Sequence, residues 1–578
     1  MSAVASLLDE HVVFRLSSVD RIGVAGYIRD LVHEGGLVRF LLHRASLVGD
    51  RKIPSPALLG KNHDRLVADL DRFVAERELP VVRFRRGDVK ELVARPYQHE
   101  AAAAGRSGVV LVGKAQERME AWVGYKDARS PLASARHPHF SFSRQARVPD
   151  HWYFYLWDEE FGPVLIKLCS YAPYPLWVVA NGHEWAKRQL AELGVGFDEL
   201  DNGLRRVEDP AAARRVCASL QAGHVRGLIE RWLPTLPSPL IPADRQAGFA
   251  WSYSVRQLEL SDTAVFDRPQ AGRAWFEAAI RDQLSLGRPD KVRIVFGRQL
   301  KLHGKNQTGG RFATQVISRG VYPRIEIGYK SCRAKAYLKK ERALRIETTI
   351  NNASDFELKK TLNAANWRAL RQTGAQINAR FLAALGENDP GLPDADTLTA
   401  VVLPSVHAGQ RAPGLRFGDP RVSALLGALC SFDHLWHGLT NRSLRAQMAQ
   451  LFDPGYSSAR ATYDLRRLRL KGLIERIPGS HRYQVSAYGR RIATFFTRLT
   501  SRVVVPALSQ LDQASRPSRR APQALAAAWR AYDNEIRALL QKAGLAAHHK
   551  HPAAPQQRTQ TRRKTCLKRQ ERNYQGGG

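Results

Sequence analysis

The chain has few cysteines and no apolar run long enough to cross a bilayer. Its five cysteines are scattered, and none belongs to a Cys-x-x-Cys pair. This spacing argues against a disulfide framework and a cysteine-rich zinc site, and it is typical of reduced thiols in a cytoplasm. Residues 1–10 are too short and too acidic a stretch for a secretory signal. We therefore expect a cytoplasmic protein with no membrane partner.

Signatures of several enzyme classes are also missing. Residues 108–113 lack the glycine spacing of a dinucleotide-binding motif or a P-loop. No serine nucleophile elbow and no catalytic Cys–His signature stands out. The motifs therefore give no support to a nucleotide-dependent enzyme or to a serine or cysteine hydrolase.

Acidic residues are scarce relative to basic ones. The chain has 89 Lys and Arg against 54 Asp and Glu, which gives a formal net charge of +35 and a pI of about 10.4. An excess of this size predicts a polyanionic partner. Because no apolar segment points to a membrane surface, we expect that partner to be nucleic acid.

The order of the expected elements indicates an α+β multidomain fold with mixed sheets. At 578 residues and 44% hydrophobic composition the chain can bury several cores, and no internal repeat is apparent. We expect an N-terminal α/β region over 1–126, a central α+β domain over 150–360, a helical connector over 361–415, a C-terminal domain of helices and a hairpin over 416–511, and a disordered basic tail with one helix over 512–578. In the central domain, strands are expected at 152–157, 164–171, 176–179, 292–296, 311–317, 324–329 and 344–350, and helices near 181–193, 210–233 and 244–262.

Three amphipathic helices and a hairpin are expected over 416–511. Thr440 and Ser457 stand where they can cap the second and third helices. The third helix, 459–471, is expected to bury an apolar stripe and to leave its basic residues largely on the solvent side. The turn 478–481 lies between two short strands and predicts a hairpin with a basic tip. The residues expected to contact nucleic acid here are Arg460, Arg466, Arg467, Arg469, Lys471, Arg476, His481 and Arg482.

The segment TYDLRRLRLKGLIERIPGSHRYQVSAYGRR, which begins at Thr462, resembles the recognition helix, wing and following helix of MarR-like and related winged-helix transcription factors. The resemblance implies double-stranded DNA as the partner. The recognition helix would supply phosphate and guanine contacts in the major groove, and the wing would reach a neighbouring groove or the backbone. The alternative is a winged helix used for protein contacts or as a scaffold.

A first patch that could carry chemistry lies over 153–190. Asp158 and Glu160 follow a very apolar expected strand, and His183 and Glu184 open a helix after another such strand. If the strands are neighbours, these side chains converge at one sheet edge. Carboxylates there would bind Mg²⁺ and the histidine would move a proton in phosphodiester cleavage. The alternative is structural, because Asn181 with Glu184 resembles a helix cap and acidic residues often end a strand.

A second patch lies over 324–352, where a Tyr- and Lys-containing run precedes an alternating strand with Arg and Glu. The run resembles a segment of some rolling-circle replication initiators. That resemblance implies that Tyr337 is a nucleophile or phosphate contact, Lys340 a phosphate ligand, and Glu347 a metal or base carboxylate. The chain departs from those enzymes at their His-hydrophobic-His metal motif, because its nearest counterpart, 137–139, has a proline between the histidines.

The alternative for the second patch is a basic β-surface that follows a phosphodiester backbone. Its nucleic-acid contacts would be Lys335, Lys339, Lys340 and Arg345.

Over most of its length the chain also resembles a large bacterial protein family, through segments such as FGPVLIKLCSYAPYP, NGHEWAKRQL and RALRIETTIN. This resemblance implies no activity, so three functions stay open. The first is a DNA-cleaving or nicking enzyme, as of a mobile element, with Mg²⁺ held by Asp158, Glu160 and Glu347. The second is a DNA-binding regulator without catalysis. The third is a ribonucleoprotein component that grips structured RNA. A homodimer is compatible with each of them.

Overall fold

A computed structural model of the chain describes residues 3–49, 53–127, 139–285, 293–296, 315–316, 323–340, 342–386, 395–407, 409–431 and 434–505, with a few positions between 531 and 538. The predicted basic tail, 512–578, therefore lies almost wholly outside the described residues. Among the described helices, none is both long and apolar enough to cross a membrane.

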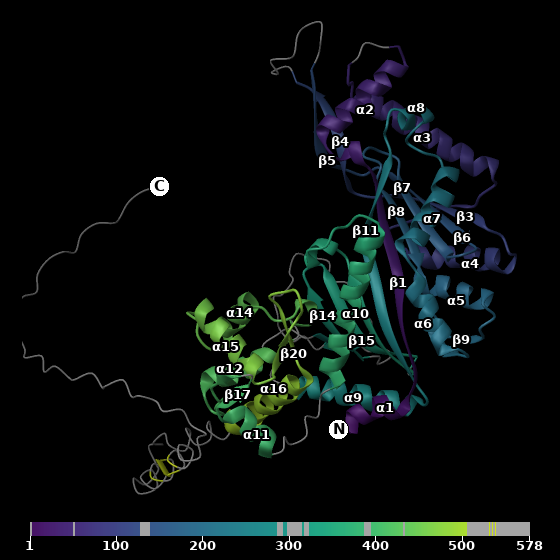
Figure 1. The fold of residues 1–578 in the computed structure, drawn as a ribbon. Coiled ribbons are helices and arrows are strands. Elements are labelled where there is room, and N and C mark those ends of the chain that lie inside the picture. The colour runs from purple at the N-terminus through teal and green to yellow at the C-terminus, as the bar shows by residue number, and fades with distance from the viewer. Residues whose placement is uncertain are drawn as a thin grey trace, which may run out of the picture.

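One mixed sheet of twelve strands forms the centre of the molecule (Figure 1). Its two middle strands, β1 (Val12–Ile28) and β11 (Trp251–Phe266), pair antiparallel along their length. On the side of β1 follow β8 (Leu176–Asn181), β7 (Gly162–Cys169), β6 (Asp150–Asp158), β3 (Gly108–Gln116) and β2 (Val81–Arg83). On the side of β11 follow β16 (Ala343–Ile350), β15 (Cys332–Lys339), β14 (Pro323–Tyr329), β12 (Arg293–Phe296) and β13 (Gln315–Val316).

The two halves of the sheet have nearly the same topology. In each half the long central strand comes first in the chain, and the last strand of the half pairs with it. Three consecutive strands then form an antiparallel meander, β6–β7–β8 or β14–β15–β16. A parallel pair of strands closes each outer edge, β2 with β3 or β12 with β13. The earlier strand of the pair is outermost in the first half, and the later strand is outermost in the second. The chain therefore contains a structural repeat that its sequence does not display.

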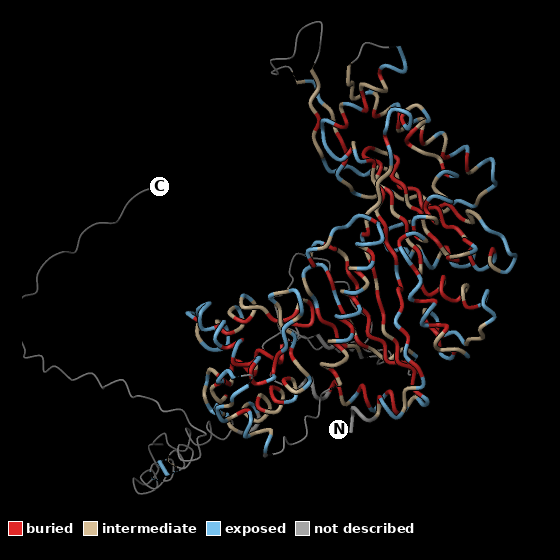
Figure 2. Tube along the Cα trace, in the orientation of Figure 1, coloured by how far each residue is buried: buried red, intermediate tan, exposed pale blue. Residues whose placement is uncertain are grey.

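Helices cover the apolar face of this sheet. α10 (Ala364–Gly386) packs on β11 and β16, and the Phe73 ring of α3 (Ala57–Glu76) meets Phe154 of β6 edge-on. One hydrophobic core runs along the sheet from β3 to β14 (Figure 2), so the predicted regions 1–126 and 150–360 share a sheet and a core. The remaining helices are α1 (Ala3–His11), α2 (Glu34–Leu47), α4 (Lys90–Ala103), α5 (Gly182–Glu192), α6 (Pro210–Ser219), α7 (Ala222–Trp232), α8 (Pro242–Gln246) and α9 (Pro269–Ser285). Before β11, two hairpins of the described chain lie outside the sheet, β4 (Met119–Lys126) with β5 (Phe140–Arg147) and β9 (Phe197–Glu199) with β10 (Leu204–Val207).

Most expected elements of the central region are present, but the helix predicted over 244–262 is wrong. Only the short α8 is helical there, and most of the range belongs to β11. The run from Trp251 mixes β-branched, aromatic and polar residues, and it pairs with β1 on one side and β16 on the other. Long-range pairing on both edges outweighs the local helical pattern of this segment.

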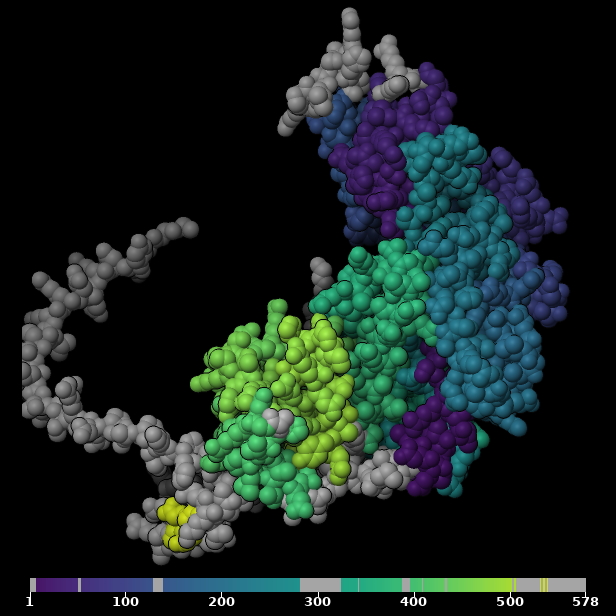
Figure 3. Space-filling view, viewed as in Figure 1, coloured from purple at the N-terminus to yellow at the C-terminus, as the bar shows by residue number. Residues whose placement is uncertain are grey.

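The C-terminal elements pack around a core of their own and form a separate lobe (Figure 3). Thr440 accepts a hydrogen bond from the Ser443 amide and Ser457 accepts one from the Arg460 amide, so both predicted caps are confirmed. Trp436 stacks on Tyr329 of β14 with ring centroids 5.7 Å apart, which joins the lobe to the sheet. The elements are α11 (Ala395–Val402), β17 (Ser405–His407), β18 (Gln410–Ala412), α12 (Pro420–Leu429), α13 (His434–His437), α14 (Asn441–Leu451), α15 (Ser458–Leu470), β19 (Ile474–Arg476), β20 (Tyr483–Val485) and α16 (Ala487–Leu499).

Candidate functional sites

Polar side chains form a row across the middle of the sheet, on the face opposite α10. In the strand register Ser18 of β1 lies beside Ser261 of β11, which lies beside Glu347 of β16, which lies beside Lys335 of β15. Side chains two residues apart on a strand share a face. Glu259 and Arg345 therefore belong to the same face. Each lies two residues from the row along its own strand, and the two lie on opposite sides of the row because β11 and β16 are antiparallel.

A β-bulge places Asp20 in this row. Val19 pairs with Leu260 and Ile22 pairs with Leu258, so two residues of β1, Asp20 and Arg21, stand opposite Glu259 alone. Bulges of this kind redirect a side chain and are frequent beside functional sites. Here the bulge turns Asp20 toward β16.

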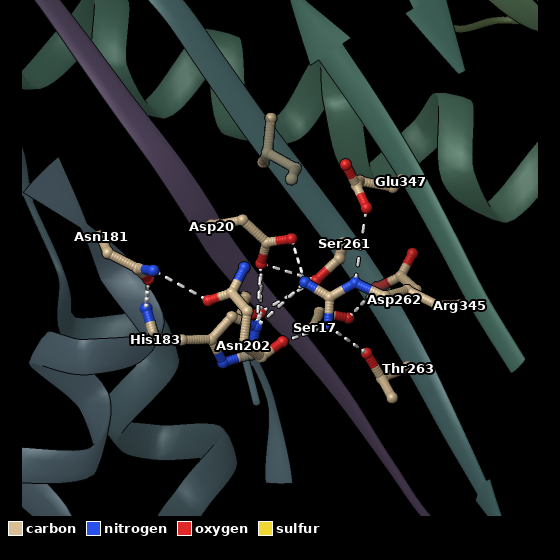
Figure 4. Close-up of polar contacts among 12 residues, drawn as sticks. Ser17, Asp20, Asn181, His183, Asn202, Ser261, Asp262, Thr263, Arg345 and Glu347 are labelled. Carbon is tan, nitrogen blue, oxygen red and sulfur yellow. Dashed lines mark hydrogen bonds and ion pairs between the residues drawn. The ribbon is translucent and has the colours of Figure 1, made fainter. Parts of the chain in front are cut away.

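Asp20 is fully buried and is held by cationic and hydroxyl groups (Figure 4). It forms an ion pair with Arg345, lies 2.9 Å from Nε2 of His183, and accepts a hydrogen bond of 2.8 Å from Ser261. Burial opposes ionisation of Asp20, but Arg345 and His183 outweigh it and hold the pKa of this carboxyl below its usual range. Asp20 is therefore a carboxylate at neutral pH.

His183 reaches Asp20 from the start of α5. The side chain of Asn181 caps this helix by accepting hydrogen bonds from the amides of His183 and Glu184. His183 is buried, and this burial lowers its pKa although Asp20 acts in the opposite direction. A neutral imidazole between Ser18 and Asp20 can accept or donate one proton.

Glu347 occupies the second buried acidic position. Its carboxylate lies 2.6 Å from Nζ of Lys335 and accepts a hydrogen bond of 2.9 Å from the Tyr337 hydroxyl. Burial opposes its ionisation, but hydrogen bonding with Glu259 and the charge of Lys335 lower its pKa. Burial and the adjacent Glu347 raise the pKa of Glu259 to about 8. At neutral pH one carboxyl of this pair therefore keeps its proton.

Three carboxylates on this face, Asp20, Glu259 and Glu347, could hold a metal ion, and we call them the acidic row. One oxygen each from Asp20, Glu259 and Glu347 can be chosen so that all lie within 4.8 Å of one another. An all-oxygen set suits a hard divalent cation. Arg345 and Lys335 already balance two of the three charges, and a proton on Glu259 neutralises the third. A cation would therefore have to displace that proton.

Asp158 and Glu160 lie elsewhere in the fold. Asp158 is fully buried at the end of β6, accepts hydrogen bonds from the amides of Glu160 and Phe161, and pairs with Arg231 of α7 at 2.7 Å. Glu160 pairs with the same arginine at 2.8 Å. These contacts fix the turn after β6 against α7, and the structure does not bring either carboxylate into the acidic row.

Glu184 forms ion pairs within α5, with Lys187 at 2.8 Å and with Arg188 at 3.1 Å. Of the six residues predicted as catalytic, His183, Tyr337 and Glu347 thus converge, while Asp158, Glu160 and Glu184 sit in structural ion pairs.

The basic residues of the second patch mostly turn inward. Arg345 is buried, and Lys335 is paired with Glu347. Lys339 donates to the carbonyl of Asn202 at 2.7 Å, and burial lowers its pKa to about 8. Lys340 is exposed and pairs with Asp201 at 2.7 Å. These cations neutralise the acidic row and its rim, which leaves little free charge here for a phosphodiester backbone.

Sequence reasoning missed Asp20, Glu259 and Ser261. A usable signal was the acidic residue among the β-branched residues Val19, Ile22 and Val24, because a charge within a buried strand needs a partner. Glu259 and Ser261 were hidden by the incorrect helix prediction.

On α15, the residues with exposed side chains include Arg460, Thr462, Tyr463, Arg466 and Arg469, while Ala461, Leu465 and Leu468 are buried. The prediction of exposure is wrong for Arg467 and Lys471. Arg467 donates to the carbonyls of Pro413 and Gly414, and Lys471 donates to the carbonyl of Ala400 at 2.7 Å, so both connect α15 to the segment 400–414, which precedes α12.

The hairpin residues differ in the same way. Arg476 and His481 are exposed, whereas Arg482 is half-buried and pairs with Glu357 at 3.2 Å. The structure thus leaves two of the three predicted hairpin contacts, Arg476 and His481, exposed.

Comparisons with protein-family models, with curated proteins and with solved structures each found no match.

Proposed function

We propose that this chain is a duplex-DNA-binding protein with α15 as its recognition helix. The observation that carries the proposal is the exposed side of α15, which presents Arg460, Arg466 and Arg469 together with Thr462 and Tyr463. Arginines on one side of a helix provide bidentate contacts to guanine and to phosphates in a major groove. The net charge of +35 favours the same partner.

The order of elements supports this reading. Helices α12, α14 and α15 precede the hairpin β19–β20, and a bridge between Leu439 and Tyr483 adds a third extended segment beside that hairpin. A winged helix would have this order of elements, and its hairpin would reach the DNA beside the recognition helix. Arg476 and His481 stand at the exposed end of that hairpin.

The test is selection of duplexes from a random library with the full chain, followed by titration of the selected duplex. Arg466→Gln with Arg469→Gln should weaken binding at least tenfold and reduce the salt dependence of log K by about 2. A matched control is Arg83→Gln with Arg86→Gln, two exposed arginines at and beside the outer edge strand β2. Equal binding by wild type and the α15 variant would reject the proposal.

A second candidate function is cation-dependent phosphodiester cleavage at the acidic row, with Mg²⁺ as the cation. The proximity of Asp20, Glu259 and Glu347 favours it, and His183 and Tyr337 lie beside these carboxylates as groups that can move a proton. Glu347→Gln should abolish Mg²⁺-dependent nicking of supercoiled DNA. Glu160→Gln is the matched control because Glu160 is an acid outside the row, and it should keep the activity. Nicking that is equal in both variants, or that is absent from the wild type, would exclude this function.

A further inference from the structure

A groove opens on the sheet beside the acidic row. It has a volume of about 410 Å³, and its floor is formed by β7, β8, β1 and β11. The lining contains three cations, Arg21, Lys167 and Arg256, and no carboxylate. Two amides, Gln257 and Asn351, complete its polar part.

The cations are set at different depths. Arg21 keeps 44% of its side chain exposed and donates to Gln257 at 3.1 Å, while its distance to the exposed Glu91 is 3.9 Å. Arg256 is exposed. Lys167 lies deeper, pairs with Glu117, and holds its Nζ 4.6 Å from the centre of the Trp177 ring. Arg21 and Arg256 are therefore the groups available to an anionic ligand.

The rest of the floor is apolar and aromatic. Leu165, Trp177 and Val179 occupy neighbouring strands and are only partly buried. The Trp177 ring is backed by Lys167 and by His151, whose ring centre is 6.0 Å away. A partly exposed indole fixed in this way offers a flat surface for stacking.

We propose that this groove binds single-stranded nucleic acid. Base faces would stack on Trp177 and lie over Leu165 and Val179, while phosphates would be met by Arg21 and Arg256. A duplex hides its base faces within the stack, so it could use the arginines but not the apolar floor. Three spacings between the four strands amount to roughly 14 Å, which exceeds the reach of a single phosphate. The site therefore accepts an extended strand.

The proposal does not depend on α15 or on cleavage. Arg21 directly follows Asp20, and Gln257 lies two residues before Glu259, so the groove ends at the acidic row. Asp20 and Glu347 are buried and do not line the groove, so a strand can bind there without contact with that row. Duplex binding by α15 and single-strand binding by the sheet are separate properties of one chain.

The test uses the full chain and labelled oligothymidylate and oligouridylate of about twelve nucleotides, which distinguish DNA from RNA. Arg21→Gln with Arg256→Gln should weaken binding of the preferred oligonucleotide at least tenfold and reduce the salt slope by about 1.4. Trp177→Ala should weaken it roughly tenfold, and Trp177→Phe should keep binding while removing part of the fluorescence quenching on saturation.

Arg83→Gln with Arg86→Gln is the matched control for lost charge and should bind like the wild type. Duplex binding is measured on the same samples, so that failure of the groove and failure of α15 give different patterns. Unchanged thermal melting of the groove variants shows that the fold persists. Three results would each overturn the proposal. They are an affinity for a mononucleotide equal to that for the oligonucleotide, a loss of single-strand binding only in the α15 variant, and no binding of either oligonucleotide.

Discussion

Glu259 of β11 and Glu347 of β16 are diagonal neighbours on one face of the sheet, because Glu259 pairs with Thr349 and Glu347 stands two residues before it. Burial and this neighbour raise the pKa of Glu259 to about 8. The folded chain therefore retains a proton that the unfolded chain releases near pH 4.5.

The first prediction concerns stability and pH. Between about pH 4.5 and 8 the folded state binds more protons at Glu259 than the unfolded state, so this group lowers stability as the pH rises, by up to roughly 1 kcal/mol per pH unit. Glu259→Gln carries no titrating proton and should flatten that part of the profile. Urea unfolding from pH 5 to 9 measures both chains. Parallel profiles would contradict a raised pKa.

The second prediction concerns Arg345, which is buried between two acids. Arg345→Met removes the ion-pair partner of Asp20. It also removes the guanidinium whose Nε lies 3.5 Å from the carboxylate of Glu347. Loss of one partner from a buried pair costs roughly 3–5 kcal/mol. The double variant with Asp20→Asn should recover part of this loss in the same denaturation experiment. A single variant as stable as wild type would show that the ion pair contributes nothing.

The third prediction concerns the close approach of α5 to β1. A Cβ at Gly182 would stand 2.2 Å from the carbonyl oxygen of Val19, so Gly182→Ala must push the helix start and His183 away from Asp20. We expect a loss of about 1–3 kcal/mol in stability. Gly223→Ala in α7 is the control, because a Cβ there meets nothing within 4 Å. Similar melting temperatures for the two variants would be inconsistent with this packing.

The fourth prediction separates two neighbouring arginines of α15. Arg467 is buried and donates to two backbone carbonyls, whereas Arg466 is exposed. Arg467→Ala should therefore lower the melting temperature, through a loss of about 1–3 kcal/mol. Arg466→Ala should leave melting unchanged and weaken duplex binding. The reverse pattern would mean that the roles of the two arginines are exchanged.

Part of this structure was predictable because its signals are local. The caps at Thr440 and Ser457 depend on side chains within one helical turn, and the strands β6, β7, β8, β14 and β16 are short alternating or apolar runs, whereas β15 was not predicted. His183, Tyr337 and Glu347 were recognised as residues able to carry chemistry. Their convergence was not predictable, because it depends on which strands become neighbours.

The remaining differences have long-range causes. Asp158 looks like a free acid after a strand, but its partners Arg231 and Trp232 come from α7, more than seventy residues later. Asp20 joins Arg345 only because β1 pairs with β11 and β11 with β16. Arg467 follows the basic pattern of its exposed neighbours, and only the position of Pro413 and Gly414 buries it.

The pairing of β1 with β11 also governs how the chain can be assembled. β1 is synthesised more than two hundred residues before β11, so one of its edges has no partner until the ribosome has passed residue 266. An unpaired strand edge invites association with other chains. A chain that stops before β11 should therefore aggregate, and successful folding of the whole protein waits for its second half.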